Sequence, residues 1–565
     1  MDNNSSQIVL VKDISPINSG SSSQNLTVMD NRLHFSAYDS ENGTELWVSD
    51  GTSEGTQLVK DIYPGRDSSG YVNSSAPKNF TVLDNRLYFS AYNSENGGEL
   101  WVSDGTSEGT QLVKDIYPGN NNSAYVNSSS PNDLTVLDER LYFSAFDGVN
   151  GGELWVSDGT SEGTQLVKDI NPGNIGSLLK NFTVLDNRLY FSAFDGVNGG
   201  ELWVSDGTSE GTQLVKDINP GSKNSLPENL TVFDNRLYFS AFDAENGKEL
   251  WVSDGTSEGT QLVKDINPNS GNYIYSNSSL PKNLTVFDDR LYFTAFDGEN
   301  GKELWVSDGT SEGTQLVKNI DPSSDYFGPG FAPDELTVFD DLLYFTASDG
   351  VNGNELWVSD GTSEGTQLVK DLNPGRDSSF PYGSYLNELI VFDDELYFVA
   401  DDGVNGAELF KLVVDELPTI ITGTSGFDNL IGTNGADQIK GLNGKDLLDG
   451  GGGNDTLDGG NGRDSLIGGA GDDSLFGGNG RDLLIGGAGD DILTGWTGKD
   501  IFVLNLDRSS DTITDFVLGS DRLSLGGNLE FNDLSFSGST IQVGNELLAT
   551  LDGVDTQVLT ADNFV

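Results

Sequence analysis

The chain has 565 residues, a formal net charge of −59, no cysteine and a single histidine, His34. Disulfide scaffolds, thiol enzymes, zinc fingers and iron–sulfur sites are excluded, because each needs Cys or several His. The charge disfavours DNA and anionic membranes as partners, and no apolar run is long enough to cross a membrane. We therefore expect no nucleic-acid partner and no membrane span, and the length indicates more than one domain.

The first three quarters of the chain are a repeat array. The phrase ELWVSDGTSEGTQLVK occurs seven times, at spacings of 48 to 54 residues. A degenerate eighth copy has Phe410 where the others have Trp. We expect these tryptophans to pack between repeats: Trp47, Trp101, Trp155, Trp203, Trp251, Trp305 and Trp357.

Each repeat predicts four strands. In the unit that begins at Asp133, the β-prone runs are 134–137, 140–146, 153–157 and 164–168, separated by Gly, Asn and Asp turn signals. The second run carries large apolar groups on both faces, as a sheet stacked between two neighbours requires. Four antiparallel strands repeated about every 50 residues are typical of β-propeller blades.

The ends of the array predict a closed ring. The eighth copy has three strands, at about 388–393, 395–402 and 407–414, and residues 7–14 form an unattached fourth strand. Strand exchange between the ends would give an eight-bladed propeller without open sheet edges. An open solenoid of blades is the alternative. The units resemble the ELWxxDGT repeat family, which implies little about activity.

At Gly423 the repeat period drops to nine. Glycine stands at positions one and four of nine successive frames, Asp at position six and a large apolar residue at position eight. Glycines permit left-handed backbone and can turn carbonyls toward an ion, and carboxylate and carbonyl oxygens suit Ca²⁺. The position-six residues are Asp428, Asp437, Asp446, Asp455, Asp464, Asp473, Asp482, Asp491 and Asp500.

This segment closely resembles the RTX (repeats-in-toxin) β-roll. The resemblance implies a parallel roll in which several Ca²⁺ ions lie between successive turns, held by the Asp side chains and loop carbonyls. The implied carbonyl ligands include Gly451, Gly453, Gly460, Gly462, Gly469, Gly471, Gly478, Gly480, Gly487 and Gly489. The double glycine is absent at Thr424, Thr433, Leu442 and Trp496, so the outer turns are weaker candidates.

The remaining chain resembles the cap and the type I secretion signal that follow RTX arrays. The predicted fold is all-β, with domains at 1–417 (propeller), 418–503 (roll) and 504–565 (a small β cap with the secretion signal). The resemblance implies a secreted protein, extracellular or on the cell surface, with the type I secretion machinery as a partner. No Sec-type signal peptide is visible at residue 1.

Aromatic residues in the propeller loops are the candidate ligand-binding residues. Rings among small polar residues suit stacking on sugars or contacts with a protein. The alternative is that they pack onto their own loops. The Asp-x-x-Asn-Gly loops, such as 147–151, are either further cation sites or simple turns. The loop aromatics are Tyr71, Tyr125, Tyr273, Tyr275, Phe327 and Tyr382.

Two functions follow from these patterns. The first is a non-enzymatic, calcium-folded adhesion or extracellular-matrix module, with a polysaccharide, a cell-surface or matrix protein or a second copy of the chain as candidate partners. The alternative is a secreted carbohydrate-active enzyme that uses propeller carboxylates. Seven nearly identical repeats offer no unique acid or base, so we expect no enzyme and assign no catalytic residue.

Overall fold

The computed structural model describes residues 7–15, 20–119, 126–268, 277–322, 332–375, 382–393, 395–413, 420–433, 435–505, 510–526, 529, 531–544 and 546–565. Two compact units divide the chain, Ile8–Leu412 and Val413–Val565. Each is described separately below. No helix in the described part is long and apolar enough to span a membrane.

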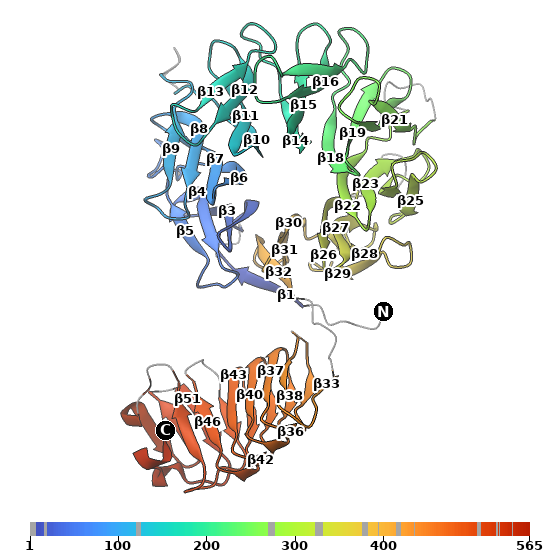
Figure 1. Cartoon of the computed structure of the whole chain (residues 1–565). Coiled ribbons are helices and arrows are strands. Elements are labelled where there is room, and N and C mark those ends of the chain that lie inside the picture. Colours follow the sequence, from blue (N-terminus) through green and yellow to red (C-terminus); the bar gives the residue numbers. More distant parts are fainter. Residues whose placement is uncertain are drawn as a thin grey trace. The chain divides into compact units, whose positions relative to one another are not determined.

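The first unit is an eight-bladed β-propeller, as predicted (Figure 1). Its blades are antiparallel sheets of consecutive strands. Blade 1 contains β2(Gln24–Met29), β3(Arg32–Asp39), β4(Gly43–Ser49) and β5(Gln57–Lys60), and blade 2 contains β6(Lys78–Leu83), β7(Arg86–Asn93), β8(Gly97–Ser103) and β9(Gln111–Lys114). Blade 3 contains β10(Asn132–Leu137), β11(Arg140–Phe146), β12(Gly152–Ser157) and β13(Gln165–Lys168). Blade 4 contains β14(Lys180–Leu185), β15(Arg188–Phe194), β16(Gly200–Ser205) and β17(Gln213–Lys216).

The later blades repeat this order. Blade 5 contains β18(Glu228–Phe233), β19(Arg236–Asp243), β20(Gly247–Ser253) and β21(Gln261–Lys264), and blade 6 contains β22(Lys282–Phe287), β23(Arg290–Phe296), β24(Lys302–Ser307) and β25(Gln315–Lys318). Blade 7 contains β26(Asp334–Phe339), β27(Leu342–Ser348), β28(Asn354–Ser359) and β29(Gln367–Lys370). Blade 8 contains β30(Asn387–Phe392), β31(Glu395–Asp401) and β32(Ala407–Val413), and is completed by β1(Gln7–Lys12).

Local sequence explains the meander within a blade. Asp138 and Glu139 join β10 to β11 with φ of 50° and 56°, as a tight hairpin turn with a left-handed backbone requires. Leu141 and Phe143 then lie fully buried on β11, opposite Ser157 and Trp155 of β12. First strands of neighbouring blades contact one another, which places them nearest the ring axis.

The core of the propeller lies between blades. One buried cluster joins Leu137, Tyr142 and Leu154 of blade 3 to Phe191 and Trp203 of blade 4. Trp203 is 7% exposed, and its equivalents in the other six complete repeats are buried to a similar degree. Each blade therefore depends on its neighbour for burial of its apolar face.

The ring closes by strand exchange. β1 pairs with β32, so the first strand of the chain completes the eighth blade (Figure 1). The Nζ of Lys12 also donates hydrogen bonds to the carbonyls of Ser53 and Thr56 in blade 1, at 2.9 and 2.7 Å. The predicted closed propeller is thus confirmed, and the open solenoid is not formed.

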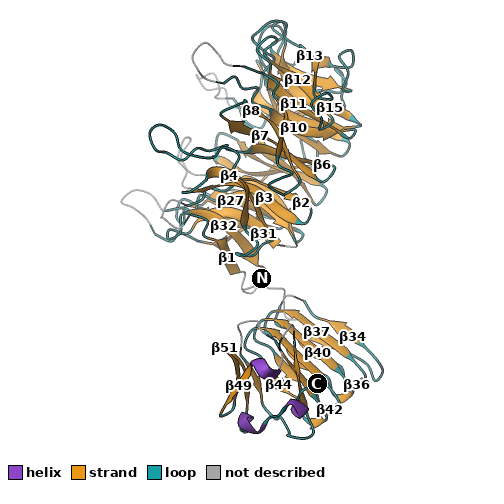
Figure 2. Ribbon diagram, turned by 90° about the vertical axis from the view of Figure 1, so that its left-hand side faces the viewer, coloured by secondary structure: helices purple, strands orange, loops and turns teal. Residues whose placement is uncertain are grey.

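The second unit begins with a parallel β-roll (Figure 2). One sheet contains β34(Asn429–Ile431), β37(Leu447–Gly452), β40(Ser465–Ala470), β43(Leu483–Ala488), β46(Ile501–Leu504) and β48(Arg522–Leu525). The facing sheet contains β33(Ile420–Thr422), β35(Gln438–Lys440), β38(Thr456–Asp458), β41(Ser474–Phe476), β44(Ile492–Thr494) and β47(Asp511–Ile513). A narrow third ladder is formed by β36(Asn443–Gly444), β39(Asn461–Gly462), β42(Asn479–Gly480) and β45(Thr497–Gly498).

Two nonapeptides make one turn of this roll. Leu448 pairs in register with Leu466, and Leu457 with Leu475, so equivalent residues recur every 18 positions. The apolar residue at position eight fills the space between the sheets. All of these residues are fully buried from the second frame onward: Ile439, Leu448, Leu457, Leu466, Leu475, Leu484, Leu493 and Phe502.

A small cap completes the unit. It contains β49(Leu534–Ser537), β50(Thr540–Val543) and β51(Glu546–Leu551), with 3₁₀ turns η1(Phe531–Asp533), η2(Thr556–Val558) and η3(Ala561–Asn563). β51 pairs in parallel with β47, which continues the roll sheet into the cap. Ile541 and Leu551 belong to the same hydrophobic cluster as the roll leucines, so roll and cap share one core.

Candidate calcium sites and propeller surface

The array aspartates line up inside the loops of the roll. From Asp437 to Asp500, the position-six residues are 1–2% exposed, and Asp428 at the first turn is half-buried. From Asp446 to Asp500, Oδ1 accepts a hydrogen bond from the backbone N–H of the aspartate one turn earlier, as Oδ1 of Asp473 does from Asp455 at 2.8 Å. This bond holds the side chain through Oδ1 and does not involve the second carboxylate oxygen, Oδ2.

The second carboxylate oxygen is unsatisfied in the middle of the array. Oδ2 is buried and has no hydrogen-bond partner in Asp446, Asp455, Asp464, Asp473 and Asp482. A buried anionic oxygen without a partner is costly, because it has lost its hydration and gained nothing in return. These atoms therefore fit a cationic ligand.

The first two frames differ from the middle ones. Thr433 replaces the second glycine of its frame, and its backbone N–H and Oγ1 donate to Oδ2 of Asp437 at 2.6 and 2.9 Å. Thr424 does the same for Asp428. The two threonine departures thus coincide with carboxylates that already have donors, whereas in the frame of Leu442 the Oδ2 of Asp446 has no partner.

The glycines bring backbone carbonyls close to these oxygens. A Cβ on Gly468 would lie 2.3 Å from Oδ2 of Asp473 and 2.4 Å from the carbonyl oxygen of Gly486. A Cβ on Gly469, where φ is +114°, would lie 2.0 Å from the carbonyl oxygen of Gly451. A Cβ built on any of the other predicted glycine ligands would likewise lie 1.6 to 2.8 Å from a carbonyl oxygen of the adjacent turn: Gly451, Gly453, Gly460, Gly462, Gly471, Gly478, Gly480, Gly487 and Gly489.

Burial and neighbouring carboxylates disfavour the charged form of the array aspartates. Burial raises the pKa of Asp473 and Asp482 to about 7, an effect reinforced by carboxylates of adjacent turns and opposed by the backbone hydrogen bond. Burial likewise raises the pKa of Asp455 and Asp500 to about 6. No group of three or more acidic or His side chains among the described residues is arranged to hold a metal, so backbone carbonyls would supply the other ligands. Carboxylate and carbonyl oxygens in a glycine-lined cradle fit calcium.

Two of the six aromatic residues predicted to bind a ligand lie in the described part of the propeller. Tyr71 is 75% exposed in the loop after β5, and Tyr382 is 47% exposed in the loop after β29. These two lie in separate loops. Tyr125, Tyr273, Tyr275 and Phe327 lie outside the described residues.

The Asp-x-x-Asn-Gly loops use their carboxylates for their own turns. Oδ1 of Asp147 accepts hydrogen bonds from the N–H groups of Val149 and Asn150, at 2.8 and 2.7 Å. Its Oδ2 accepts one from Nδ2 of Asn150 at 2.7 Å. This geometry supports the turn interpretation over a cation site.

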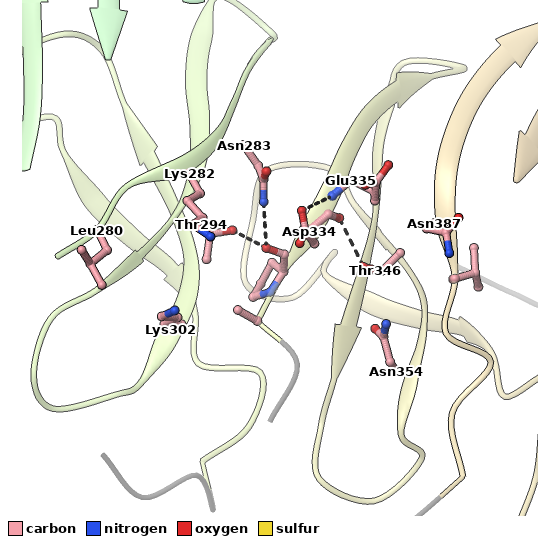
Figure 3. Close-up of a pocket in the computed structure, with 13 residues that line it drawn as sticks. Leu280, Lys282, Asn283, Thr294, Lys302, Asp334, Glu335, Thr346, Asn354 and Asn387 are labelled. Carbon is pink, nitrogen blue, oxygen red and sulfur yellow. Dashed lines mark hydrogen bonds between the residues drawn. The ribbon is translucent and has the colours of Figure 1, made fainter. Parts of the chain in front are cut away.

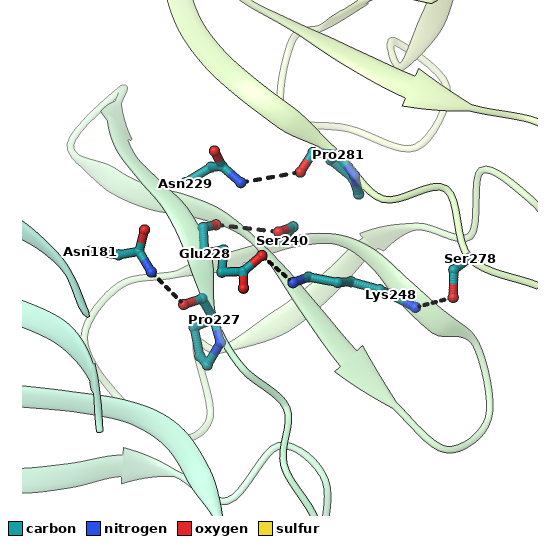
Figure 4. Close-up of polar contacts among 8 residues, drawn as sticks. All are labelled: Asn181, Pro227, Glu228, Asn229, Ser240, Lys248, Ser278 and Pro281. Carbon is teal, nitrogen blue, oxygen red and sulfur yellow. Dashed lines mark hydrogen bonds and ion pairs between the residues drawn. The ribbon is translucent and has the colours of Figure 1, made fainter. Parts of the chain in front are cut away.

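One pocket of about 220 Å³ lies where blades 6, 7 and 8 meet (Figure 3). Lys282 and Lys302 of blade 6 line it, and burial together with the charge of Lys282 lowers the pKa of Lys302. In blade 5 the same two positions hold Glu228 and Lys248, which form an ion pair (Figure 4). The repeat symmetry is thus broken at this pocket.

Comparisons with known proteins separate the two units. The model of the RTX calcium-binding nonapeptide repeat matches four times, at residues 422–457, 449–484, 458–493 and 476–508. No curated protein sequence matches the chain significantly. The ELWxxDGT resemblance of the propeller stays a prediction.

Solved structures resemble the chain only weakly. A puromycin hydrolase aligns at 11% identity and a TM-score of 0.39, over 73% of this chain and 63% of its own. A puromycin-hydrolyzing peptidase of Mycobacterium tuberculosis gives 12% and 0.40, over 77% and 65%, and a prolyl endopeptidase gives 11% and 0.41, over 73% and 57%. The chain thus spans about three fifths of the length of these proteins, and similarity this low carries no information on activity. The segment from residue 422 to 508, in contrast, consists of RTX calcium-binding nonapeptide repeats.

Proposed function

We propose that this chain is a secreted, non-enzymatic binding protein whose roll is folded by calcium outside the cell. The observation that carries the proposal is the column of buried Oδ2 atoms without partners, from Asp446 to Asp482. Calcium in each cradle would neutralise the carboxylates, and its binding free energy would become folding free energy. Extracellular calcium modules have dissociation constants of roughly 10⁻⁴–10⁻³ M, which suits a switch between cytoplasm and exterior.

The propeller supplies the binding surface in this proposal. Its repeats are nearly identical, and the differences between them lie mainly in the loops, which is where binding residues are usually found. The RTX repeats support export by a type I system, with the partner a polysaccharide or a protein of the cell surface or matrix. Assays of a polysaccharide panel in calcium should show no turnover, whereas hydrolysis of any member would favour the carbohydrate-active enzyme.

Limited proteolysis of the full chain tests the calcium switch. We expect cleavage sites mapped by mass spectrometry to cluster within 420–565 in excess chelator and to disappear as calcium is titrated. Magnesium is the control, because it prefers a smaller octahedral shell and retains its waters. A roll that resists protease equally well in chelator would overturn the proposal.

A further inference from the structure

The two edges of the roll carry opposite charges. Because two nonapeptides form one turn, alternate frames place position five on alternate edges. One edge holds Asn454, Asp472 and Asp490 at this position, after Ala436 in the second frame. The other holds Phe427 followed by the basic stripe, defined as Lys445, Arg463, Arg481 and Lys499.

The basic stripe is a straight column. Each of its residues directly follows one strand of the narrow ladder β36–β39–β42–β45, in which Gly444, Gly462, Gly480 and Gly498 pair in register. Neighbouring strands lie about 4.8 Å apart, so the four cations recur at that spacing along the roll. All four are exposed. Figure 2 labels β36 and β42 on this edge.

The fold gains little from this arrangement. The only ion pairs among the described residues are Lys248–Glu228 and Lys411–Glu395, so no salt bridge neutralises the stripe. Like charges directly opposite one another on paired strands are destabilising. A chain with only 30 basic residues against 89 acidic ones has nevertheless placed four of them in one line.

Exposed aromatic rings lie at both ends of the stripe. Phe427 is 71% exposed in the first turn, and Trp496 is 61% exposed beside β45. Trp496 replaces the glycine of its frame and has a φ of 62°, a conformation that is unusual for a bulky residue. Strained backbone that presents an exposed side chain is typical of functional positions.

The amide side chains next to the stripe form a second column. Asn461 donates from Nδ2 to Oδ1 of Asn443 at 2.8 Å, and Asn479 donates to Asn461 at 2.9 Å. Thr497 ends the series with a hydrogen bond from Oγ1 to Asn479 at 2.7 Å. Polar groups that can bond to hydroxyls therefore accompany the cations along their whole length.

We propose that this edge binds a linear acidic polysaccharide whose sugars carry carboxylates. The cations would pair with the carboxylates, the amide column would bond to hydroxyls, and the end rings would stack on sugar faces. A single extended chain can follow a column one residue wide. Duplex DNA and a membrane surface are wider than this column, so they would also contact the acidic surface of this −59 chain around it and be repelled.

The inference rests on the proposed function, since only the calcium-folded roll aligns the stripe. Binding is measured on the full chain in millimolar calcium with fluorescein-labelled oligogalacturonate, by anisotropy. We expect saturable binding that weakens with salt, and at least tenfold weaker binding of the fully methyl-esterified oligomer, which has the same backbone without the charge. The double variant Arg463→Gln/Arg481→Gln should lose at least tenfold in affinity and show a shallower salt dependence.

The opposite edge provides the matched control. Asp472→Asn/Asp490→Asn changes two residues in the same turns and should leave oligogalacturonate affinity at or above the wild-type value. Both double variants must show wild-type calcium protection from protease, so that loss of binding is separated from loss of the roll. If calcium does not protect the roll, the proposed function fails. If calcium protects it and the oligomer does not bind, or duplex DNA or anionic vesicles bind as tightly, only the polysaccharide inference is overturned.

Discussion

Glu249 and Ser279 join two blades of the propeller through a buried carboxylate. The side chain of Glu249 accepts hydrogen bonds from the backbone N–H of Ser279 at 2.7 Å and from its hydroxyl, and a third from the N–H of Ile266 at 2.9 Å. Ser279 lies on the segment that leads into the next blade, and Ile266 follows β21. A fully buried Glu thus braces this transition between blades. Equivalent buried Glu residues accept from a Ser ahead of the next blade in the same way: Glu45, Glu99, Glu153, Glu201, Glu355 and Glu408. Glu303 is also buried and accepts from the N–H of Ile320, just after β25.

Removal of one brace should destabilise the ring measurably. Glu249→Ala leaves two buried backbone N–H groups without acceptors, at about 1–3 kcal/mol each, so we expect a loss of about 3 kcal/mol in urea unfolding. Glu258→Ala, at an exposed position of the same blade, should change stability by less than about 0.5 kcal/mol. Equal midpoints for the two variants would contradict the bracing role.

The braces also predict a pH dependence. Burial raises the pKa of Glu249 from 4.5 to about 8 and that of Glu201 to about 7, against the opposing effect of their hydrogen bonds. The folded state therefore binds more protons than the unfolded state between pH 4.5 and 8, and the stability from these groups is complete below 4.5 and lost as pH rises toward 8. The melting temperature in saturating calcium should fall over this interval. Glu249→Gln should show a smaller fall than the wild type, and parallel curves would contradict the pKa assignment.

Tryptophan packing between blades gives a third prediction. Trp203 is 7% exposed in the cluster shared by blades 3 and 4, so Trp203→Ala should leave a cavity that costs about 3–5 kcal/mol. Trp496→Ala, at a 61% exposed position, is the control and should leave the melting temperature nearly unchanged. Unaltered melting of the Trp203 variant would exclude an interblade role.

Individual calcium sites should be separable by substitution. Asp473→Asn removes the negative charge and one of the two oxygens of a carboxylate whose Oδ2 has no partner, so it should lower the calcium stoichiometry or shift the titration midpoint upward. Asp437→Asn should have a smaller effect, because Thr433 already satisfies that Oδ2. Isothermal titration calorimetry compares the two. A larger effect at Asp437 would reverse the assignment of strong and weak turns.

Glycine geometry predicts which turns tolerate a side chain. Gly469→Ala places a methyl group about 2.0 Å from the Gly451 carbonyl, so calcium should no longer protect the roll from protease. Gly519 also has a positive φ, of 83°, but its Cβ would meet nothing within 4 Å. Gly519→Ala should therefore retain protection, with only the backbone strain of a left-handed alanine, about 1 kcal/mol. Protection of both variants would show that the turns are not closely packed.

Most of the architecture was readable from the sequence because both arrays repeat. The expected strands at 140–146 and 153–157 correspond closely to β11 and β12. In the same blade, the first strand, β10, begins at Asn132, earlier than predicted. Its pairing with β11 shifts register between Asn132 and Thr135, where Asp133 has a φ of 55°. No local apolar pattern marks such a feature, since it depends on pairing with β11.

The sequence also predicted the calcium array, but it did not predict the opposite charges of the two roll edges or the buried Glu residues that brace the blades. Lys445 and Asp472 occupy the same position of their frames, and they lie on different edges only because two frames make one turn. Glu249 looked like an ordinary polar residue at the start of a strand. Its burial depends on a segment from the next repeat, which returns about 30 residues later and carries the donors of Ser279.

The seam between β1 and β32 sets an order of events for the ring. These strands stand at opposite ends of the propeller sequence, so their pairing has the largest sequence separation in the ring. Contacts of such long sequence separation form slowly and late. The same seam is where a pulled or heated ring would first come apart, one strand detaching while seven complete blades stay stacked. Its amide protons should therefore be the first in the propeller's paired strands to exchange with solvent.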